Sequence, residues 1–95
     1  MIEKHESRRI RSEIRRVLLE VWDPIGIKDE PKAQDEYDMY LGEVFELLTQ
    51  QKSDNQIADY LIWVVNERMG LGQAKKQQMM ETIHALRNIP LRKTG

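Results

Sequence analysis

The residues best suited to chemistry in this sequence are carboxylates gathered before Tyr40. Carboxylate oxygens are the ligands that Ca²⁺ and Mg²⁺ prefer, and a histidine further along the chain could add a nitrogen. The spacing fits no known ligand scheme, because an EF-hand loop begun at Asp23 would place Ile25 and Ile27 where oxygen ligands are needed. We therefore expect no metal site. The candidate ligands weighed are Asp29, Glu30, Asp35, Glu36, Asp38 and His84.

General acid–base catalysis would need a histidine or carboxylate held beside a reacting group. His5 lies close to one end of the chain, and His84 stands alone on a helical pattern. The sequence has no cysteine, glycine-rich phosphate loop, nucleophile elbow or pair of metal-binding histidines. We expect no catalytic residue and no cofactor, and hence a protein that is not an enzyme.

Protein binding is the function that the sequence favours most. Tyrosines adjoin the acidic group, and a mixture of aromatic and charged side chains is typical of binding hot spots. The alternative is that the aromatic side chains form the core, in which case Trp22 and Leu61 are expected to be buried. We predict that at least one of Tyr37, Tyr40 and Trp63 is exposed enough to contact a partner. The predicted partner-binding residues are Asp29, Glu30, Glu36, Tyr37, Asp38, Tyr40 and Trp63.

A second hypothesis is that the protein is a small nucleic-acid-associated regulator. Five arginines lie on one half of the first predicted helix and could face phosphates. The isoelectric point near 6.1 and the lack of a helix-turn-helix glycine turn weigh against it. The alternative is a solvated helix face with Glu–Arg pairs. The arginines are Arg8, Arg9, Arg11, Arg15 and Arg16.

Length and composition indicate one globular domain. The chain has 95 residues, of which 40% are hydrophobic and 33% charged, and this is enough for one core. We treat residues 1–95 as a single domain with mobile ends at 1–6 and 91–95. The longest apolar run, Leu61 to Val65, is far shorter than the roughly 20 residues of a membrane helix. No signal peptide is apparent, so a cytoplasmic protein is expected.

Charge is distributed unevenly along the chain. Residues 1–16 carry a net charge of +3, residues 17–67 carry −9 and residues 68–95 carry +5. An acidic centre between basic ends predicts either pairing between helices or an acidic face for a cationic partner.

Two helices are predicted in the first half of the chain. Apolar residues from Glu6 to about Trp22 recur at steps of three and four and form one helical stripe. Pro24 and Gly26 end that helix and open a loop over residues 23–34, with Ile25 and Ile27 turned toward the core. The second helix is expected from residue 34 or 35 to about residue 50, capped by Asp35.

Two further helices follow, and nothing indicates a strand. Ser53 and Gln56 form the pattern of a capping box and predict a helix to about Met69, ended by Gly70. Its apolar surface extends most of the way round and includes Ile62 and Trp63, so a homodimer through this helix is possible. A weaker pattern predicts a fourth helix from residue 73 to about 88. The predicted fold is an all-α antiparallel bundle of about four helices.

Short motifs resemble those of a known family. These are W-D-P-I-G from Trp22 and D-E-Y-D-M-Y from Asp35, separated by about a dozen residues, with A-D-Y-L and E-R-M-G-L in the third helix. Over about residues 14–72 the chain is similar to the YugE-like family of small bacterial cytoplasmic proteins. The resemblance implies a small helical fold and no established activity. By analogy, it suggests an immunity or antitoxin-like inhibitor that blocks a basic surface of a bacterial toxin with its own acidic face.

Overall fold

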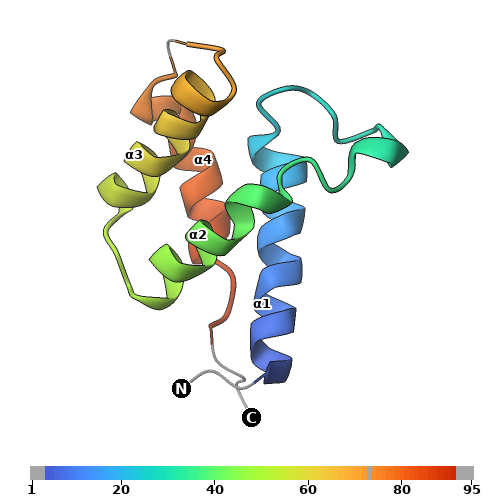
Figure 1. Ribbon diagram of the computed structural model, residues 1–95. Helices are drawn as coiled ribbons and strands as arrows, with labels where there is room; N and C mark the ends of the chain where they lie inside the picture. Colours follow the sequence, from blue (N-terminus) through green and yellow to red (C-terminus); the bar gives the residue numbers. More distant parts are fainter. Residues whose placement is uncertain (1–3, 73, 92–95) are drawn as a thin grey trace.

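The computed structural model describes residues 4–72 and 74–91. Within these ranges the chain folds into four α-helices and contains no strand (Figure 1), which confirms the predicted all-α bundle. Residues 1–3 and 92–95, part of the ends predicted to be mobile, lie outside the described ranges. The α-helices are α1 (Lys4–Val17), α2 (Asp38–Thr49), α3 (Asp54–Trp63) and α4 (Lys76–Arg87).

The first helix begins earlier than the pattern predicted, since Lys4 is already helical. Its buried stripe contains Ile10, Ile14 and Val17, as the spacing of three and four requires. The helix then widens into a π-helical turn, η1 (Leu18–Trp22), closed by a 2.9 Å bond from the Asp23 amide to the Leu18 carbonyl. The wider turn carries Trp22 into the core.

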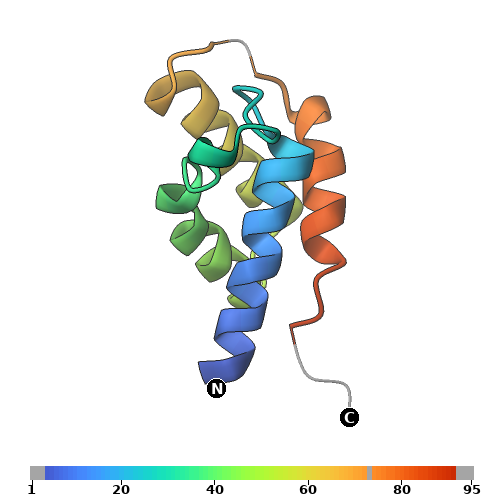
Figure 2. The same ribbon diagram turned by 90° about the vertical axis from the view of Figure 1, so that its right-hand side faces the viewer.

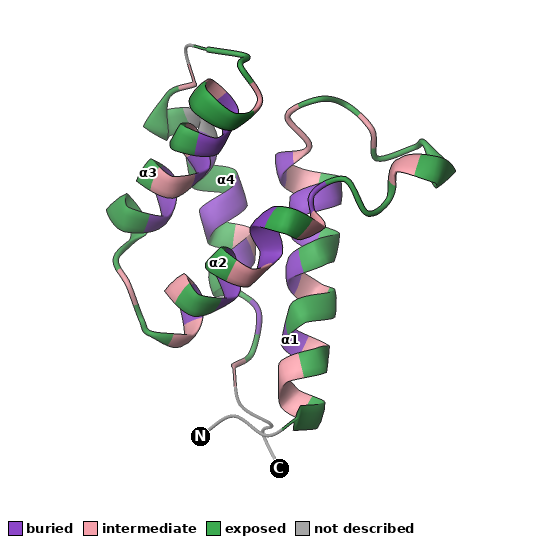
Figure 3. Cartoon of the chain, viewed as in Figure 1, coloured by how far each residue is buried: buried purple, intermediate pink, exposed green. Residues whose placement is uncertain are grey.

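The helices pack as an antiparallel arrangement around that core. Figure 1 shows α2 crossing in front of α4, and Figure 2 shows α4 descending beside α1 in the opposite direction. The closest contacts between elements join α3 with α4, α1 with α2, and α4 with η1. Figure 3 places the buried residues on the inward sides of the four helices. The loop after η1 projects from one end of the bundle and holds a short 3-10 helix, η2 (Pro31–Ala33).

The second helix starts three residues later than its predicted cap, so the assignment of Asp35 as the cap was wrong. Tyr37 precedes the first helical residue and makes no side-chain cap. Consecutive turns occupy this segment, with the Asp38 amide bonded to the Asp35 carbonyl at 3.1 Å. Tyr37 is buried against Trp22, and this contact fixes where the helix begins.

The start of α3 is the capping box that the sequence predicted. The Ser53 hydroxyl accepts from the Gln56 amide at 3.2 Å, and the Gln56 side chain accepts from the Ser53 amide at 3.0 Å. The helix continues as a second π-helical turn, η3 (Val64–Arg68). Gly70 then adopts φ 66°, a left-handed conformation that glycine takes without the usual Cβ clash, which confirms it as the terminator.

Replacement of Ser53 by alanine is expected to lower the free energy of unfolding by about 1 kcal/mol. The substitution leaves the Gln56 amide without its side-chain acceptor while α3 keeps its buried face. Urea denaturation followed by circular dichroism measures the change. Asn55→Ala, an exposed change in the same turn outside the capping box, should have an effect several times smaller.

The fourth helix starts at Lys76, later than the predicted residue 73, which lies outside the described ranges. It buries Met79, Ile83 and Leu86 against the other helices. Leu61 is fully buried at the centre of α3, as predicted. None of the helices in residues 4–72 and 74–91 is both long and apolar enough to cross a membrane.

Candidate functional site

The two motifs that the sequence singled out meet in space through one hydrogen-bonded group. The Tyr37 hydroxyl donates to Asp23 Oδ1 at 2.8 Å and accepts from the Ile25 amide at 3.1 Å. The same carboxylate accepts from the amides of Ile27 at 2.7 Å and Lys28 at 3.2 Å. Asp23 therefore closes the turn after η1 and ties it to the start of α2.

The environment of this group favours a charged Asp23 and a neutral Tyr37. Burial alone opposes the charge on Asp23, but the amide of Ile27, the Tyr37 hydroxyl and the amide and charge of Lys28 together hold its pKa below the usual range. Burial is also the main reason why the pKa of Tyr37 is raised, and the neighbouring Asp23 charge adds to it. The hydroxyl therefore remains a donor.

The aromatic residues of the second motif belong to the core, so the prediction that Tyr37 and Tyr40 contact a partner was wrong. Tyr37 is 3% exposed and Tyr40 is 8% exposed. Both rings pack on Trp22, with centroid distances of 5.3 Å and 6.2 Å. Trp22 is buried as predicted. Trp22 ends η1 inside the core, and its contacts with both tyrosine rings account for their burial.

The predicted acidic residues fall into two groups. Asp38 is half-buried and forms a two-pronged ion pair with Arg15, whose Nε donates to Oδ1 at 2.9 Å. This pair joins α1 to α2, which gives Asp38 a structural role. Asp29, Glu30 and Glu36 are exposed in and after the loop.

The loop is ordered by its hydrogen bonds, but Ile25 is exposed and does not turn toward the core as predicted.

Most of the arginines on α1 have partners within the chain. Arg9 bonds to Glu6 and to the Pro90 carbonyl, and Arg16 bonds to Glu13 and Glu20. The guanidinium of Arg11 lies over the Phe45 ring, 4.3 Å from its centroid. Arg9, Arg15 and Arg16 therefore form intramolecular ion pairs, as expected if α1 presents a solvated face rather than a phosphate-binding surface.

The exposed side chains of α2 and α3 form an acidic and aromatic surface. Met39, Glu43 and Glu46 follow one another at i, i+4 and i+7 on α2 and are exposed. Tyr60 and Trp63 stack on α3 with centroids 6.2 Å apart and ring planes inclined by 28°. Figure 3 shows exposed stretches on both helices. We call these five residues the acidic–aromatic face.

The two parts of the acidic–aromatic face are electrostatically connected through Tyr60. Burial and then the charge of Glu43 raise the pKa of this tyrosine above its usual value. The charge of Arg68 acts in the opposite direction, so this tyrosine is under the influence of both an acidic and a basic residue. Trp63 is 48% exposed, which confirms that one predicted aromatic residue is available at the surface.

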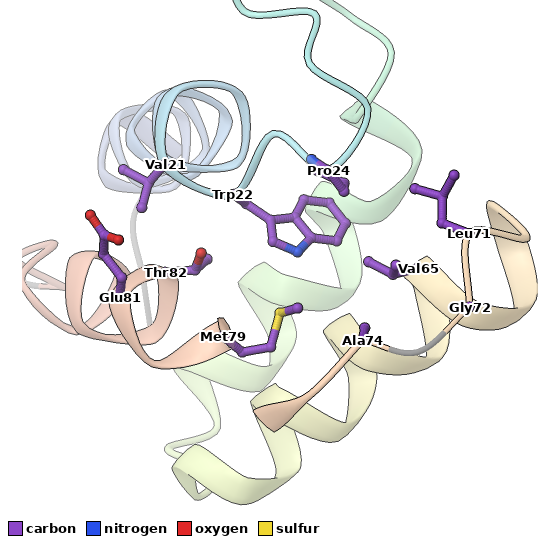
Figure 4. Close-up of a pocket in the computed structure, with 10 residues that line it drawn as sticks. All are labelled: Val21, Trp22, Pro24, Val65, Leu71, Gly72, Ala74, Met79, Glu81 and Thr82. Atoms are coloured by element: carbon purple, nitrogen blue, oxygen red, sulfur yellow. The ribbon is translucent and has the colours of Figure 1, made fainter. Parts of the chain in front are cut away.

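A pocket of about 330 Å³ lies on another side of the molecule. Figure 4 shows that η1, the segment after η3 and the first half of α4 surround it. Apolar side chains make up most of the lining, and the carboxylate of Glu81 and the hydroxyl of Thr82 come from α4. The lining residues are Val21, Trp22, Pro24, Val65, Leu71, Gly72, Ala74, Met79, Glu81 and Thr82.

The indole nitrogen of Trp22 is buried and has no hydrogen-bond partner. Figure 4 shows it directed toward the space bounded by Val65 and Met79, away from the η1 backbone. A buried donor without an acceptor costs about 1 to 3 kcal/mol. The pocket is thus lined by a side chain, 8% exposed, whose hydrogen-bond donor is covered and unused.

In the part of the chain that the structure describes, no three acidic or histidine side chains come together in a group able to hold a metal ion. His5 and His84 are both exposed and lie on different helices, α1 and α4. Within the described residues, the two histidines therefore do not form one acid–base site.

Comparisons of the chain with protein-family models, with curated proteins and with solved structures find no match. The resemblance to the YugE-like family consequently stays a prediction. The structure supplies a physical role for the residues that carry this resemblance, because Trp22 and Asp23 of one motif contact Tyr37 of the other.

The sequence contained a signal for part of the acidic–aromatic face. Between Lys32 and Lys52 the chain has no basic residue, and Met39, Glu43 and Glu46 have the spacing of one helical stripe. The pocket had no such signal. Its walls come from three segments distant in the sequence, and their relative placement is a property of the tertiary structure.

Proposed function

We propose that the protein is a non-enzymatic protein-binding module that uses the acidic–aromatic face to bind a partner with a basic surface. The observation that carries the proposal is the half-exposed Trp63 stacked on Tyr60. Tryptophan and tyrosine dominate binding hot spots, because they bury a large area at small cost in conformational entropy. The stack holds both rings in place before a partner arrives.

The charge of the surface favours a basic partner. Glu43 and Glu46 are exposed on α2, and Glu36 is exposed just before it. Arg15 on the neighbouring helix α1 is already paired with Asp38. Complementary charge of this kind speeds association and excludes acidic partners. Met39, 68% exposed, adds apolar area at the edge of the same stripe.

A second copy of the chain is a poorer occupant of this face. A two-fold dimer places the same patch on itself, so the glutamates of α2 would approach those of the other copy. Like charges at an interface oppose association. A homodimer interface through Ile62 and Trp63 would therefore bring glutamates of the two copies together. A basic partner would not meet this repulsion.

An inhibitor of the immunity type is the most specific form of this proposal. Such a protein would cover a basic active site with its acidic–aromatic face, and its location would be the bacterial cytoplasm. The nucleic-acid hypothesis has no comparable support, because Arg9, Arg15 and Arg16 already have intramolecular partners.

Site-specific photo-crosslinking in the cells of origin tests the proposal. A benzophenone amino acid replaces Trp63 in one variant and Met80 on α4, which is similarly exposed, in a control. We expect a discrete protein adduct from position 63 and not from position 80. In a third variant, Glu43→Lys and Glu46→Lys are combined with the crosslinker at position 63, and the adduct yield should fall at least about tenfold if each charge contributes on the order of 1 kcal/mol.

Three outcomes of this experiment would overturn the proposal. They are equal adducts from both positions, an adduct with the mass of two copies of the chain, and a yield that charge reversal leaves unchanged. Circular dichroism of each variant shows whether the helices are retained. Both lysine substitutions fall on exposed positions, so the fold should be unaffected.

A further inference from the structure

We propose that the pocket between η1, α4 and the segment after η3 binds a small, uncharged and largely apolar molecule that carries a hydrogen-bond-accepting oxygen. This site is separate from the acidic–aromatic face and does not depend on the proposed function. None of its ten lining residues belongs to that face.

The size and lining of the pocket define the class of ligand. A volume of about 330 Å³ lies at the lower end of the range of roughly 300 to 1,000 Å³ for ligand pockets. Val21, Val65 and Leu71 present aliphatic surface from three different segments. Ligand sites are typically apolar with a few placed polar groups, and this pocket has that composition.

The acceptor on the ligand follows from Trp22. An indole N–H can only donate, and this one has no partner. The ring itself is held by Tyr37 and Tyr40, so the direction of the N–H is fixed. A ketone, ester or hydroxyl oxygen would give the nitrogen the acceptor that it lacks.

Met79 controls access to the nitrogen. The nitrogen is covered in the structure, and Figure 4 shows the Met79 thioether as the neighbour below it. A methionine side chain has three rotatable bonds and adapts readily to new neighbours. Its displacement would be needed for a ligand oxygen to reach the N–H.

The charge of the ligand follows from Glu81. This exposed carboxylate is part of the lining, and no basic side chain accompanies it there. An anionic ligand would face repulsion from this carboxylate. Neutral molecules are therefore favoured over carboxylates of the same shape.

Three small probes test these features one at a time. Acetophenone has the acceptor oxygen, α-methylstyrene has nearly the same shape without it, and benzoate has a negative charge. The protein carries Trp63→Phe, so that Trp22 supplies the one tryptophan indole resonance in a ¹H–¹⁵N spectrum. We expect acetophenone to shift that N–H resonance downfield in a saturable manner.

The comparison among probes is quantitative. One hydrogen bond of ordinary net strength makes acetophenone bind about twofold to tenfold more tightly than α-methylstyrene. α-Methylstyrene should not produce the downfield shift, and benzoate should bind more weakly than acetophenone. The proposal is overturned if acetophenone gives no saturable shift, if α-methylstyrene produces the same shift and affinity, or if benzoate binds most tightly.

A pocket-filling variant provides an independent check. Ala74→Leu places a larger side chain in the pocket while the Ala74 amide keeps its 3.0 Å bond to Asn66 Oδ1. Ala33→Leu makes the same change in η2, away from the pocket. We expect Ala74→Leu to weaken acetophenone binding at least fivefold and Ala33→Leu to leave it unchanged. Equal affinities in the two variants would place the probe elsewhere and overturn the assignment.

Discussion

Replacement of Trp22 by alanine is expected to lower the free energy of unfolding by about 3 to 5 kcal/mol, the range for a large aromatic residue removed from a core. The side chain is 8% exposed and contacts both Tyr37 and Tyr40. Its loss would join the empty volume to the existing pocket of about 330 Å³ and remove the contact that fixes the start of α2. Chemical denaturation followed by circular dichroism measures the effect.

Phenylalanine at position 22 is the matched control, because it keeps a ring and removes the nitrogen. The unpartnered Nε1 is an unfavourable feature that phenylalanine lacks, and this gain offsets part of the lost contact area. We expect Trp22→Phe to lower the free energy of unfolding by about 1 kcal/mol, well below the alanine variant. A loss as large as that of alanine would show that Nε1 has a stabilising partner in solution.

The helices could be predicted from the sequence because local patterns determine them. Ser53 and Gln56 satisfy each other within one turn, and Gly70 takes a backbone angle that other residues avoid. The start of α2 could not be predicted in the same way. Asp35 has the chemistry of a cap, but Tyr37 is held by Trp22 and Asp23 from another helix, and that tertiary contact outweighs the local preference.

The partner-binding residues could be predicted only in part, because tertiary contacts decide which side chains are exposed. Tyr37 and Tyr40 adjoin acidic residues in the sequence, yet both rings are buried against Trp22, whereas Glu43 is exposed. Which side faces the core depends on where Trp22 lies, and the sequence alone does not reveal its position. Asp38 was counted as a surface charge, whereas Arg15 on α1 pairs with it. The exposure of Trp63 was predicted correctly, because the apolar surface of α3 exceeds what its neighbours can cover.

The two motifs stabilise the fold, and they are separate from the acidic–aromatic face proposed for binding. Trp22, Asp23 and Tyr37 stabilise the loop and align α1 with α2. The acidic–aromatic face then lies on the outer side of the helices that this contact positions. Changes in the motifs should therefore affect stability, and changes at Glu43 or Trp63 should affect binding. Variants of the motifs therefore report on loss of stability, and variants of Glu43 or Trp63 report on loss of binding.

Replacement of Asp23 by alanine is expected to lower the free energy of unfolding by about 3 kcal/mol at pH 7, because three hydrogen bonds to a charged acceptor are lost. The amides of Ile27 and Lys28 and the Tyr37 hydroxyl are the donors. Asp23 also has φ 30°, a left-handed angle that aspartate and asparagine tolerate better than alanine. Asp23→Asn therefore retains the backbone, keeps one accepting oxygen and removes the charge together with the second acceptor, with an expected loss of about 1 to 2 kcal/mol.

The difference in the free energy of unfolding between the wild type and Asp23→Asn depends on pH if the charge on Asp23 stabilises the folded protein. The pKa of Asp23 is lower in the folded protein than the value of about 3.9 in an unfolded chain. Its charge therefore contributes fully above the unfolded pKa, and the contribution is lost as the pH falls through the folded pKa. The stability difference between the wild type and Asp23→Asn should be constant from pH 7 to about 5 and decrease below about 4. Because all other carboxylates are common to both proteins, their titration largely cancels. A difference independent of pH down to 2.5 would mean that hydrogen-bond geometry, rather than charge, makes Asp23 important.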